Sequence, residues 1–141
     1  MDCIFCAIAD GAADARVVAE TESALAFLDA NPLAPGHTLV VPKDHYETLD
    51  DLPPAEGRAV FSLLHRLVPA IEAAVDADGS TVGFNNGAAA GQEVDHVHGH
   101  VIPRFAGDGG GPIHGVVGSR PDLDEGDLDD IAAHIAAAVG E

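Results

Sequence analysis

Three of the eight histidines in this 141-residue chain stand at alternate positions in the segment 96–100, His-Val-His-Gly-His. Side chains alternate between two faces along a β-strand, so this spacing predicts a strand over 94–103 with His96, His98 and His100 on one face. Neutral imidazole can bind a metal ion. It can also attack phosphorus while a neighbouring ring donates a proton or a hydrogen bond. The spacing therefore indicates a metal site or a phosphate-directed site rather than three unrelated surface histidines.

The two cysteines, Cys3 and Cys6, form a Cys-x-x-Cys pair. Such a pair is typical of half a metal site or of a redox pair. Tetrahedral zinc would require two further ligands. A redox role is less favoured, because the usual strand-then-helix context is missing. The residues themselves leave zinc ligation and free thiols open.

Alternating and β-branched apolar residues predict the strands, and apolar residues at helical spacing predict the helices. The expected strands are 16–20, 24–28, 38–42, 80–84 and 94–103, the expected helices are 54–75 and 127–139, and residues 2–10 form a short helix or an irregular arm. Pro54 suits the first turn of its helix, and Pro69 lies inside that helix. The elements do not alternate regularly, which favours an α+β fold with an antiparallel sheet.

The composition excludes some partners. The chain has 24 acidic and 6 basic side chains and a formal charge of −18, which argues against nucleic-acid polymers and anionic membranes. With 47% hydrophobic residues it can bury a core. Its length predicts a single domain over 1–141. No apolar run approaches the roughly 20 residues that span a bilayer, and the start lacks a basic leader, so a cytoplasmic location is expected.

The acidic residues are spread along the whole chain, and Lys43 is the single lysine. This pattern favours adaptation to a cytoplasm with molar salt, as in a halophile, where a dispersed acidic surface keeps a protein soluble. At about 1 M salt the Debye length is roughly 3 Å, so repulsion between surface charges is largely screened. The alternative is an ordinary acidic protein at low salt.

Residues 91–104, Gly-Gln-Glu-Val-Asp-His-Val-His-Gly-His-Val-Ile-Pro-Arg, resemble the signature of the histidine triad (HIT) family. The resemblance continues in 26–45, which contains Pro-Gly-His and Pro-Lys-x-His, and in the Cys-Ile-Phe-Cys stretch typical of bacterial and archaeal members. It covers about residues 2–105 and fades over 106–141. It implies an α+β fold with a five-stranded antiparallel sheet, a main helix and a C-terminal helix, assembled as a homodimer.

The resemblance also implies an activity. Members hydrolyse or transfer nucleoside monophosphate groups, from esters or amidates, through a nucleotidyl-histidine intermediate, which here would form on His98. His100 would bind the phosphate oxygens and help the leaving group depart, and His96 would orient the other rings. His37 matches a fourth histidine that supports the nucleophile ring. The substrate would be a purine nucleotide of AMP or GMP type.

Four further residues match the family's nucleotide contacts. Asp29 would accept the ribose hydroxyls, or would serve only as a turn aspartate. Asn85 would lie near the phosphate, and Gln92 would support the phosphate loop or simply fix that loop. Glu93 stands where members place Ser or Thr, and a carboxylate there would repel phosphate, so its side chain is expected to turn away. Gly99 replaces the family's usual apolar residue.

For the cysteines, the resemblance implies a structural zinc site completed by His45 and the first triad histidine, and no organic cofactor. Its ligands would be Cys3, Cys6, His45 and His96.

Two other functions remain open at this stage. One is a metal-dependent hydrolase whose triad holds the catalytic ion, and the other is a non-catalytic nucleotide-binding protein. The intact triad disfavours the latter. Phosphoramidates, dinucleoside polyphosphates and other adenylated compounds present the same phosphate to His98, so the leaving group is not determined, and its recognition is expected within 107–141.

Overall fold

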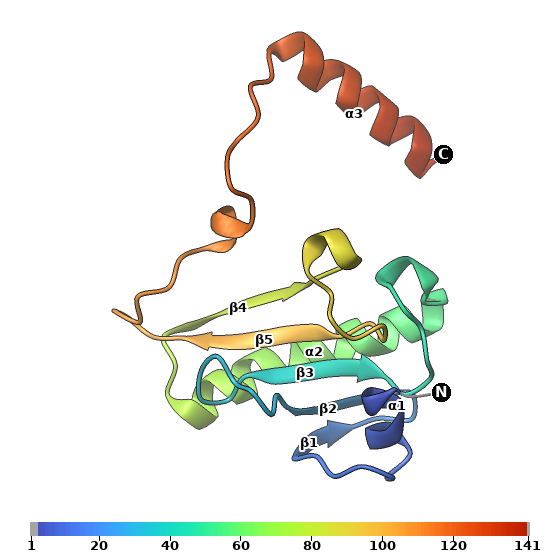
Figure 1. Cartoon of the computed structure of the whole chain (residues 1–141), viewed down its shortest axis with the longest axis vertical. Coiled ribbons are helices and arrows are strands. Elements are labelled where there is room, and N and C mark those ends of the chain that lie inside the picture. Colours follow the sequence, from blue (N-terminus) through green and yellow to red (C-terminus); the bar gives the residue numbers. More distant parts are fainter. Residues whose placement is uncertain (1–2, 141) are drawn as a thin grey trace. The chain divides into compact units, whose positions relative to one another are not determined.

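The computed structural model describes residues 3–140, which divide into two units that meet at Gly110 and Gly111 (Figure 1). Part of the arm predicted over 2–10 therefore lies outside the described residues. The first unit contains the sheet, two of the helices and all four histidines of the expected site. Each unit is described by itself below.

The first unit is built on a five-stranded sheet with the order β1-β2-β3-β5-β4, in which every neighbouring pair is antiparallel. The strands are β1 (Val17–Glu20), β2 (Ala24–Leu28), β3 (Thr38–Pro42), β4 (Gly79–Phe84) and β5 (Gly99–Arg104). The α+β fold with a five-stranded antiparallel sheet is thus confirmed. β3 and β5 are central neighbours, and Leu39 of β3 is in register with His100 of β5.

Helix α2 (Pro54–Val75) covers one face of the sheet, and its bounds are those predicted from the sequence (Figure 1). Its buried stripe packs against small and branched residues of β2, β3 and β5. The stripe consists of Val60, Leu63, Leu64, Leu67 and Ile71. This layer holds the central strands from one side and leaves their other face for α1 and the histidines.

Helix α1 (Ile4–Ala9) is the short helix predicted near the N-terminus. Its Phe5 is buried in a second apolar cluster on the sheet face opposite α2. The other buried members of this cluster are Leu25, Phe27, Leu39 and Val41. Because Cys3 and Cys6 flank Phe5, burying this ring brings both thiols to the central strands.

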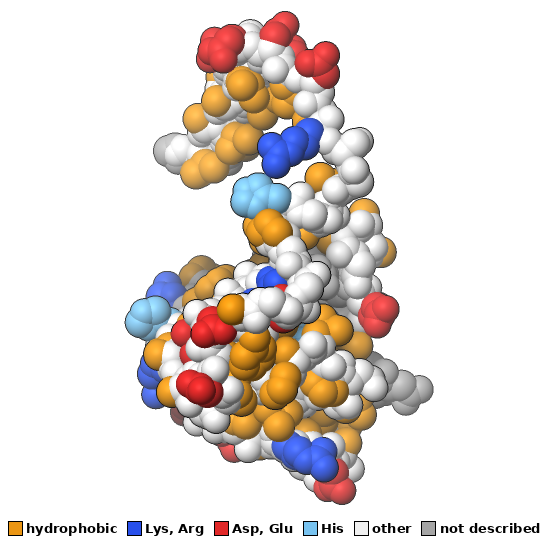
Figure 2. All heavy atoms as spheres, turned by 90° about the vertical axis from the view of Figure 1, so that its left-hand side faces the viewer, with side chains coloured by type: hydrophobic (Ala, Val, Ile, Leu, Met, Phe, Trp, Pro, Cys, Tyr) orange, Lys and Arg blue, Asp and Glu red, His pale blue; other side chains and the backbone are white. Residues whose placement is uncertain are grey.

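The second unit contains a 3₁₀ turn (Ile113–Val116) and the helix α3 (Glu125–Val139). The helix begins two residues before its predicted start because Asp124 and Asp127 form a capping box. On the face drawn in Figure 2, acidic side chains stand in separate small groups rather than in one patch. Over residues 3–140, none of the helices combines the length and apolar character that a bilayer crossing requires.

The strand predicted over 94–103 is shorter than expected, because β5 begins only at Gly99. Residues 94–98 form a bend in which the Val97 N–H donates to the Tyr46 carbonyl at 2.7 Å, outside the sheet ladder. The triad therefore straddles the start of a strand. The prediction that all three imidazoles share one strand face is wrong for this reason.

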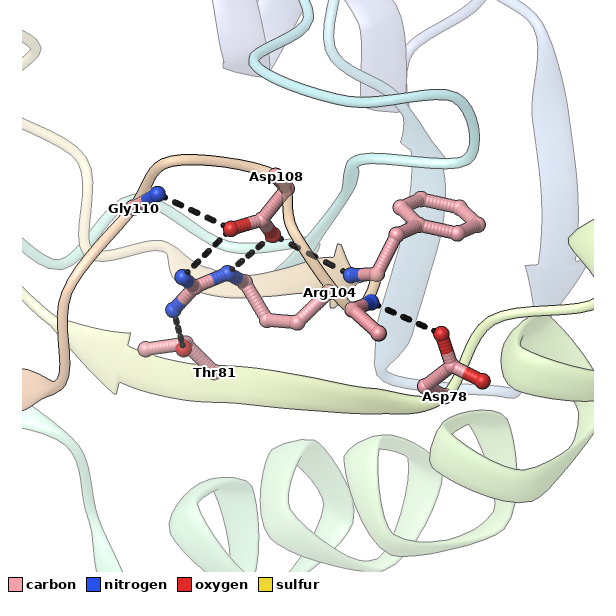
Figure 3. A network of polar contacts seen from close by, with 7 residues as sticks. Asp78, Thr81, Arg104, Asp108 and Gly110 are labelled. Carbon is pink, nitrogen blue, oxygen red and sulfur yellow. Dashed lines mark hydrogen bonds and ion pairs between the residues drawn. The ribbon is translucent and has the colours of Figure 1, made fainter.

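A polar network secures the end of β5, where the first unit closes (Figure 3). The Arg104 guanidinium donates to both oxygens of Asp108, at 2.8 and 3.0 Å, and to the Thr81 hydroxyl at 3.0 Å. Asp108 also accepts backbone N–H groups from Phe105 and Gly110. These donors hold the pKa of Asp108 well below its usual range, with Arg104 the largest cause. The carboxylate thus fixes the turn that follows the last strand.

Candidate active site

The His98 ring is oriented by the backbone immediately before it. Its Nδ1 lies 2.8 Å from the His96 carbonyl oxygen. A carbonyl can only accept, so Nδ1 carries the proton and donates it. In the neutral ring the lone pair then resides on Nε2. Nε2 is therefore the atom of His98 that is available to attack an electrophile.

The His100 ring is oriented by a chain of hydrogen bonds that begins at a backbone amide. The Leu33 N–H donates to Nδ1 of His37 at 3.1 Å, so the proton of neutral His37 is on Nε2. That Nε2 lies 2.9 Å from Nδ1 of His100 and donates to it. Neutral His100 must consequently carry its own proton on Nε2. The tautomers of both rings follow from one backbone N–H group.

Burial keeps His37 and His100 neutral. Desolvation, together with the neighbouring His98 and His37, lowers the pKa of His100 to about 4 against the opposing effect of Asp29. Burial also lowers the pKa of His37, and the Asp29 carboxylate only partly opposes this. The Nε2 atom of His100 is buried and has no hydrogen-bond partner among residues 3–140. An unsatisfied buried donor costs about 1–3 kcal/mol, which an acceptor oxygen of a ligand would recover.

The two rings are complementary. The ring centroids of His98 and His100 lie 5.1 Å apart. One ring offers a lone pair and the other offers an N–H donor. Attack on phosphorus needs this pair of groups, because a nucleophile must approach while a donor stabilises charge on a phosphate or leaving-group oxygen.

His96 points away from this pair, although its carbonyl orients His98. Its ring is fully buried, and its Nε2–H donates to the Pro42 carbonyl at 2.8 Å. Its Nδ1 therefore carries the lone pair and lies 3.3 Å from Cys3 Sγ and 3.5 Å from Cys6 Sγ. The ring of His96 belongs to the cysteine cluster, and only its backbone serves the histidine pair.

The donor atoms of Cys3, Cys6, His45 and His96 all lie within 4.8 Å of one another. Cys6 Sγ is 3.3 Å from His45 Nδ1, and the sulfur-to-His96 distances are similar. With Zn–S of about 2.3 Å and Zn–N of about 2.0–2.1 Å, sulfur and nitrogen ligands of a tetrahedral zinc lie roughly 3.5 Å apart. The carbonyl bond of His96 Nε2–H is the kind of second contact that orients a ligating ring. The four residues fit a zinc ion.

The Cys6 thiol would need a cation to become a thiolate near neutral pH. Desolvation, together with the contact with Cys3, raises its pKa to about 11. Metal binding displaces such protons, so affinity for the ion depends on pH. A protonated Cys6 is a poor nucleophile, so the cluster suits metal ligation better than thiol chemistry.

A second group of possible ligands, Asp29, His37 and His100, lies at the histidine pair. His37 Nε2 cannot ligate while it carries the proton that Leu33 places there. Neither of the two ligand groups found among the described residues unites His96, His98 and His100. The geometry thus disfavours a catalytic ion held by the triad.

One expected contact differs from the observed one, and Asp29 makes the turn contact that was considered for it. His37 was expected to support the His98 ring, but its Nε2 donates to His100 instead, because Leu33 orients it towards β5. Asp29 accepts the Asn31 N–H at 2.9 Å, which is the turn role considered for it. Its other oxygen lies 3.6 Å from His37 Nε2, so this carboxylate also borders the histidines.

Gln92 is a loop-fixing residue with all its contacts inside the chain. Its carbonyl oxygen accepts the Gly87 N–H at 2.7 Å, and its amide donates to the carbonyls of Glu47 and Val94. The other two phosphate-contact candidates, Asn85 and Glu93, have exposed side chains.

Packing against Phe84 explains why position 99 is glycine rather than the family's usual apolar residue. Gly99 is in register with Phe84, and a Cβ at Gly99 would lie 2.7 Å from the tip of the Phe84 ring. The Phe84 ring also packs on Phe61 of α2. Phe84 thus fills the space that the family's usual apolar residue would occupy. A sequence without a known register gives no signal of this exchange.

Sequence reasoning missed two residues that act on the histidines. Leu33 acts through its backbone N–H, which no side-chain pattern reveals. Phe5 places its ring against His98, with centroids 5.0 Å apart. The position of Phe5 between two cysteines was the available signal, but the Cys-x-x-Cys pattern predicts a role only for the thiols.

The fold and site define a small α+β protein built around interacting imidazole rings. The family model described as HIT domain matches residues 10–107, so the chain belongs to the histidine triad family. An uncharacterized HIT-like protein of Methanocaldococcus jannaschii is 48% identical over 123 residues, covering 87% of this chain and 94% of that protein. Adenylylsulfatase HINT3 of Arabidopsis thaliana is 43% identical over 103 residues, which are 73% of this chain and 52% of that protein. The chain thus spans about half the length of HINT3.

Solved structures agree with this family assignment. A HIT family member from Bacillus subtilis superposes with a TM-score of 0.87 at 36% identity, covering 97% of this chain and 96% of that one. A zinc-bound histidine triad family protein from Mycobacterium smegmatis has a TM-score of 0.73 at 36% identity, with 98% of each chain covered.

Proposed function

We propose that this protein is a nucleotidyl hydrolase or transferase that forms a covalent nucleotidyl intermediate on His98. The observation that carries the proposal is the complementary pair of rings, with a lone pair on His98 Nε2 and a buried N–H on His100 Nε2. Membership of the histidine triad family supports it. A non-catalytic nucleotide-binding protein would have no need of two rings locked in opposite tautomers.

In the first step, His98 Nε2 attacks the α-phosphorus of a nucleoside monophosphate ester or amidate. The new P–N bond forms as the bond to the leaving group breaks, and the leaving group takes any proton it needs from water. The positive charge that develops on the His98 ring is stabilised through Nδ1–H by the His96 carbonyl. In the second step, water attacks phosphorus, the P–N bond breaks, and the nucleoside monophosphate leaves with His98 restored.

His100 supports both steps as a neutral donor. Its Nε2–H donates a hydrogen bond to an oxygen of the phosphate or the leaving group, where negative charge grows. His37 keeps that donor in place by occupying His100 Nδ1. A neutral N–H donor of this kind lets an acidic chain with only six Lys and Arg side chains bind a phosphate oxygen through a hydrogen bond.

The proposed substrates are adenylated or guanylated compounds. Asp29 has its Oδ2 edge beside the histidines, where a carboxylate accepts ribose hydroxyls well. The name of HINT3, an adenylylsulfatase, supports adenylyl sulfate as one member of the class. Asn85 and the backbone at Glu93 are the proposed phosphate contacts beyond the histidines.

Cys3, Cys6, His45 and His96 are proposed to hold a structural zinc ion. Bound zinc would supply a cross-link between α1, the segment after β3 and the bend before β5. The zinc-bound relative from Mycobacterium smegmatis supports this assignment. Metal analysis of wild type and of Cys3→Ala tests it, and equal zinc in both proteins would defeat it.

A homodimer is proposed on family membership. Light scattering coupled to size exclusion measures the mass directly, and a monomer across the working concentration range would overturn this part.

The experiment for the activity is a substrate panel with a trapped intermediate. Wild type, His98→Ala and the exposed α2 control His65→Ala are incubated with adenosine 5′-phosphoramidate, adenylyl sulfate, diadenosine polyphosphates and their guanosine counterparts. Release of mononucleotide is followed by chromatography, and acid-free quenching with peptide mass spectrometry locates a nucleotidyl adduct. We expect turnover and an adduct on residue 98 in wild type and the control, and neither in His98→Ala. Turnover in His98→Ala at the wild-type rate would refute the nucleophile.

A further inference from the structure

Phe5 connects the cysteine cluster to the proposed nucleophile. It lies in sequence between Cys3 and Cys6 and is only 7% exposed. Its ring meets the His98 ring edge to face, with centroids 5.0 Å apart and planes at 75°. It meets the His96 ring in the same manner at 5.8 Å and 81°. One aromatic side chain thus contacts both a cluster ligand and the nucleophile.

A second connection runs through the backbone of His96. The His96 ring faces the two thiols, while its carbonyl accepts the Nδ1–H of His98 at 2.8 Å. The His98 ring is therefore held at two places, at Nδ1 by His96 and on its flank by Phe5. The carbonyl belongs to His96, which is a member of the cysteine cluster. The ring belongs to Phe5, which directly precedes Cys6, another member of that cluster.

Helix α1 depends on that cluster for its own position. It has six residues, and helices this short are not stable alone. Its N-terminus is capped by Cys3 Sγ, which accepts the Cys6 N–H at 3.2 Å. Two kinds of contact tie this helix to the rest of the unit: the apolar packing of Phe5, Ile8 and Ala9 on the second cluster, and the contacts of Cys3 and Cys6 with His96 and His45.

We propose that Phe5 is a positioning residue for His98 and that it makes the nucleophile's orientation depend on the occupancy of the Cys3–Cys6–His45–His96 cluster. This inference rests on the function proposed above. Cys3 and Cys6, as ligands of a metal ion, would hold both ends of the Cys-Ile-Phe-Cys turn and hence the Phe5 ring. Loss of the ion frees α1 and lets the His98 ring leave its bond to the His96 carbonyl. The cluster then affects the reaction rate through the orientation of His98, in addition to stabilising the position of α1.

The test compares Phe5→Leu, which removes the ring but keeps an apolar side chain, with Phe5→Tyr, which keeps the ring. Ile8→Ala is the matched control, because Ile8 also lies on α1 and packs on the same apolar cluster. Each protein is measured for bound zinc, AMP affinity, KM, and the single-turnover rate of adduct formation on His98. Nitrogen-15 NMR of the histidine rings reports, without any turnover, whether Nδ1 of His98 carries the proton and how well the bond to the His96 carbonyl protects it from exchange.

We expect Phe5→Leu to bind zinc and AMP as wild type does, to lose the protected His98 Nδ1–H signal, and to form the adduct roughly 10- to 100-fold more slowly. Phe5→Tyr should restore most of the rate, and Ile8→Ala should resemble wild type. Chelation of zinc from wild type should remove the same NMR signal. This chelation experiment applies even if Phe5→Leu does not fold.

The outcomes separate the two proposals. If wild type forms no adduct on His98, the proposed function fails, while the NMR signal still reports whether the cluster holds the ring. If wild type forms the adduct and Phe5→Leu matches it in rate and signal, the positioning role of Phe5 is wrong. A signal that survives complete removal of zinc would overturn the dependence on the cluster.

Discussion

The tautomer chain from Leu33 through His37 to His100 leads to a sharp prediction about His37. In His37→Leu, His100 Nδ1 loses the donor that now lies 2.9 Å away. The ring can then place its proton on Nδ1 and present a lone pair to the substrate oxygen, which repels instead of binding. Leucine is similar to histidine in volume, and its main cost to the fold is the Leu33 N–H, which loses its acceptor at about 1–3 kcal/mol.

The magnitude follows from the hydrogen bond that is lost. A net hydrogen bond of about 0.5–1.5 kcal/mol sets the tautomer preference, and a factor of ten corresponds to 1.4 kcal/mol. Complete removal of one donor to a developing oxyanion costs about 10²- to 10³-fold in kcat. We therefore expect kcat of His37→Leu to fall by roughly 10- to 100-fold, since only part of the His100 population changes tautomer.

The matched variant is His37→Gln. Its amide nitrogen can take the place of Nε2 and donate to His100, and its oxygen is an acceptor for the Leu33 N–H, so we expect kcat within about 3-fold of wild type. Steady-state kinetics on the substrate that wild type turns over fastest give the rates, and nitrogen-15 NMR gives the tautomer of His100. A wild-type rate in His37→Leu would refute the reasoning, and so would a His37→Gln protein as slow as His37→Leu.

Three further predictions concern stability. Burial lowers the pKa of His100 in the folded protein to about 4, so on acidification the unfolded chain binds this proton before the folded protein does. The contribution of His100 to stability is therefore complete above about pH 6.5 and falls towards pH 4. Melting curves should show this decline, and the decline should be shallower in His100→Asn. Gly99→Ala should lower the free energy of unfolding by about 1–3 kcal/mol, because the added Cβ would clash with Phe84. Gly83→Ala is the control, because no atom lies within 4 Å of the added Cβ, and its free energy of unfolding should be nearly unchanged. Urea denaturation measures both, and equal effects would contradict the packing argument. The charge of −18 predicts that stability rises from low to molar KCl, and a midpoint that falls with salt would exclude the halophilic interpretation.

The sequence predicted the scaffold well, because its signals are local. The apolar spacing of the residues that follow Pro54 gave the bounds of α2, and the β-branched run over 38–42 gave β3. The alternate histidines pointed to the candidate site, and His98 and His100 do lie beside each other there. Alternation alone was misleading over 94–98, where the Tyr46 carbonyl takes the Val97 N–H and ends the ladder before Gly99.

The division of labour among the four histidines was decided by tertiary structure. Residue types and spacing indicated a site at the alternate histidines, and the family resemblance added the thiols, His37, His45 and the Asp29 carboxylate. They could not determine that the His96 ring turns to the thiols, because this depends on Pro42 of β3 accepting its Nε2–H. Nor could they show that His37 serves His100, because a backbone N–H in the loop before β3 sets its tautomer. A hydrogen bond acts over about 3 Å, and the chain shows which atoms lie that close only after it has folded.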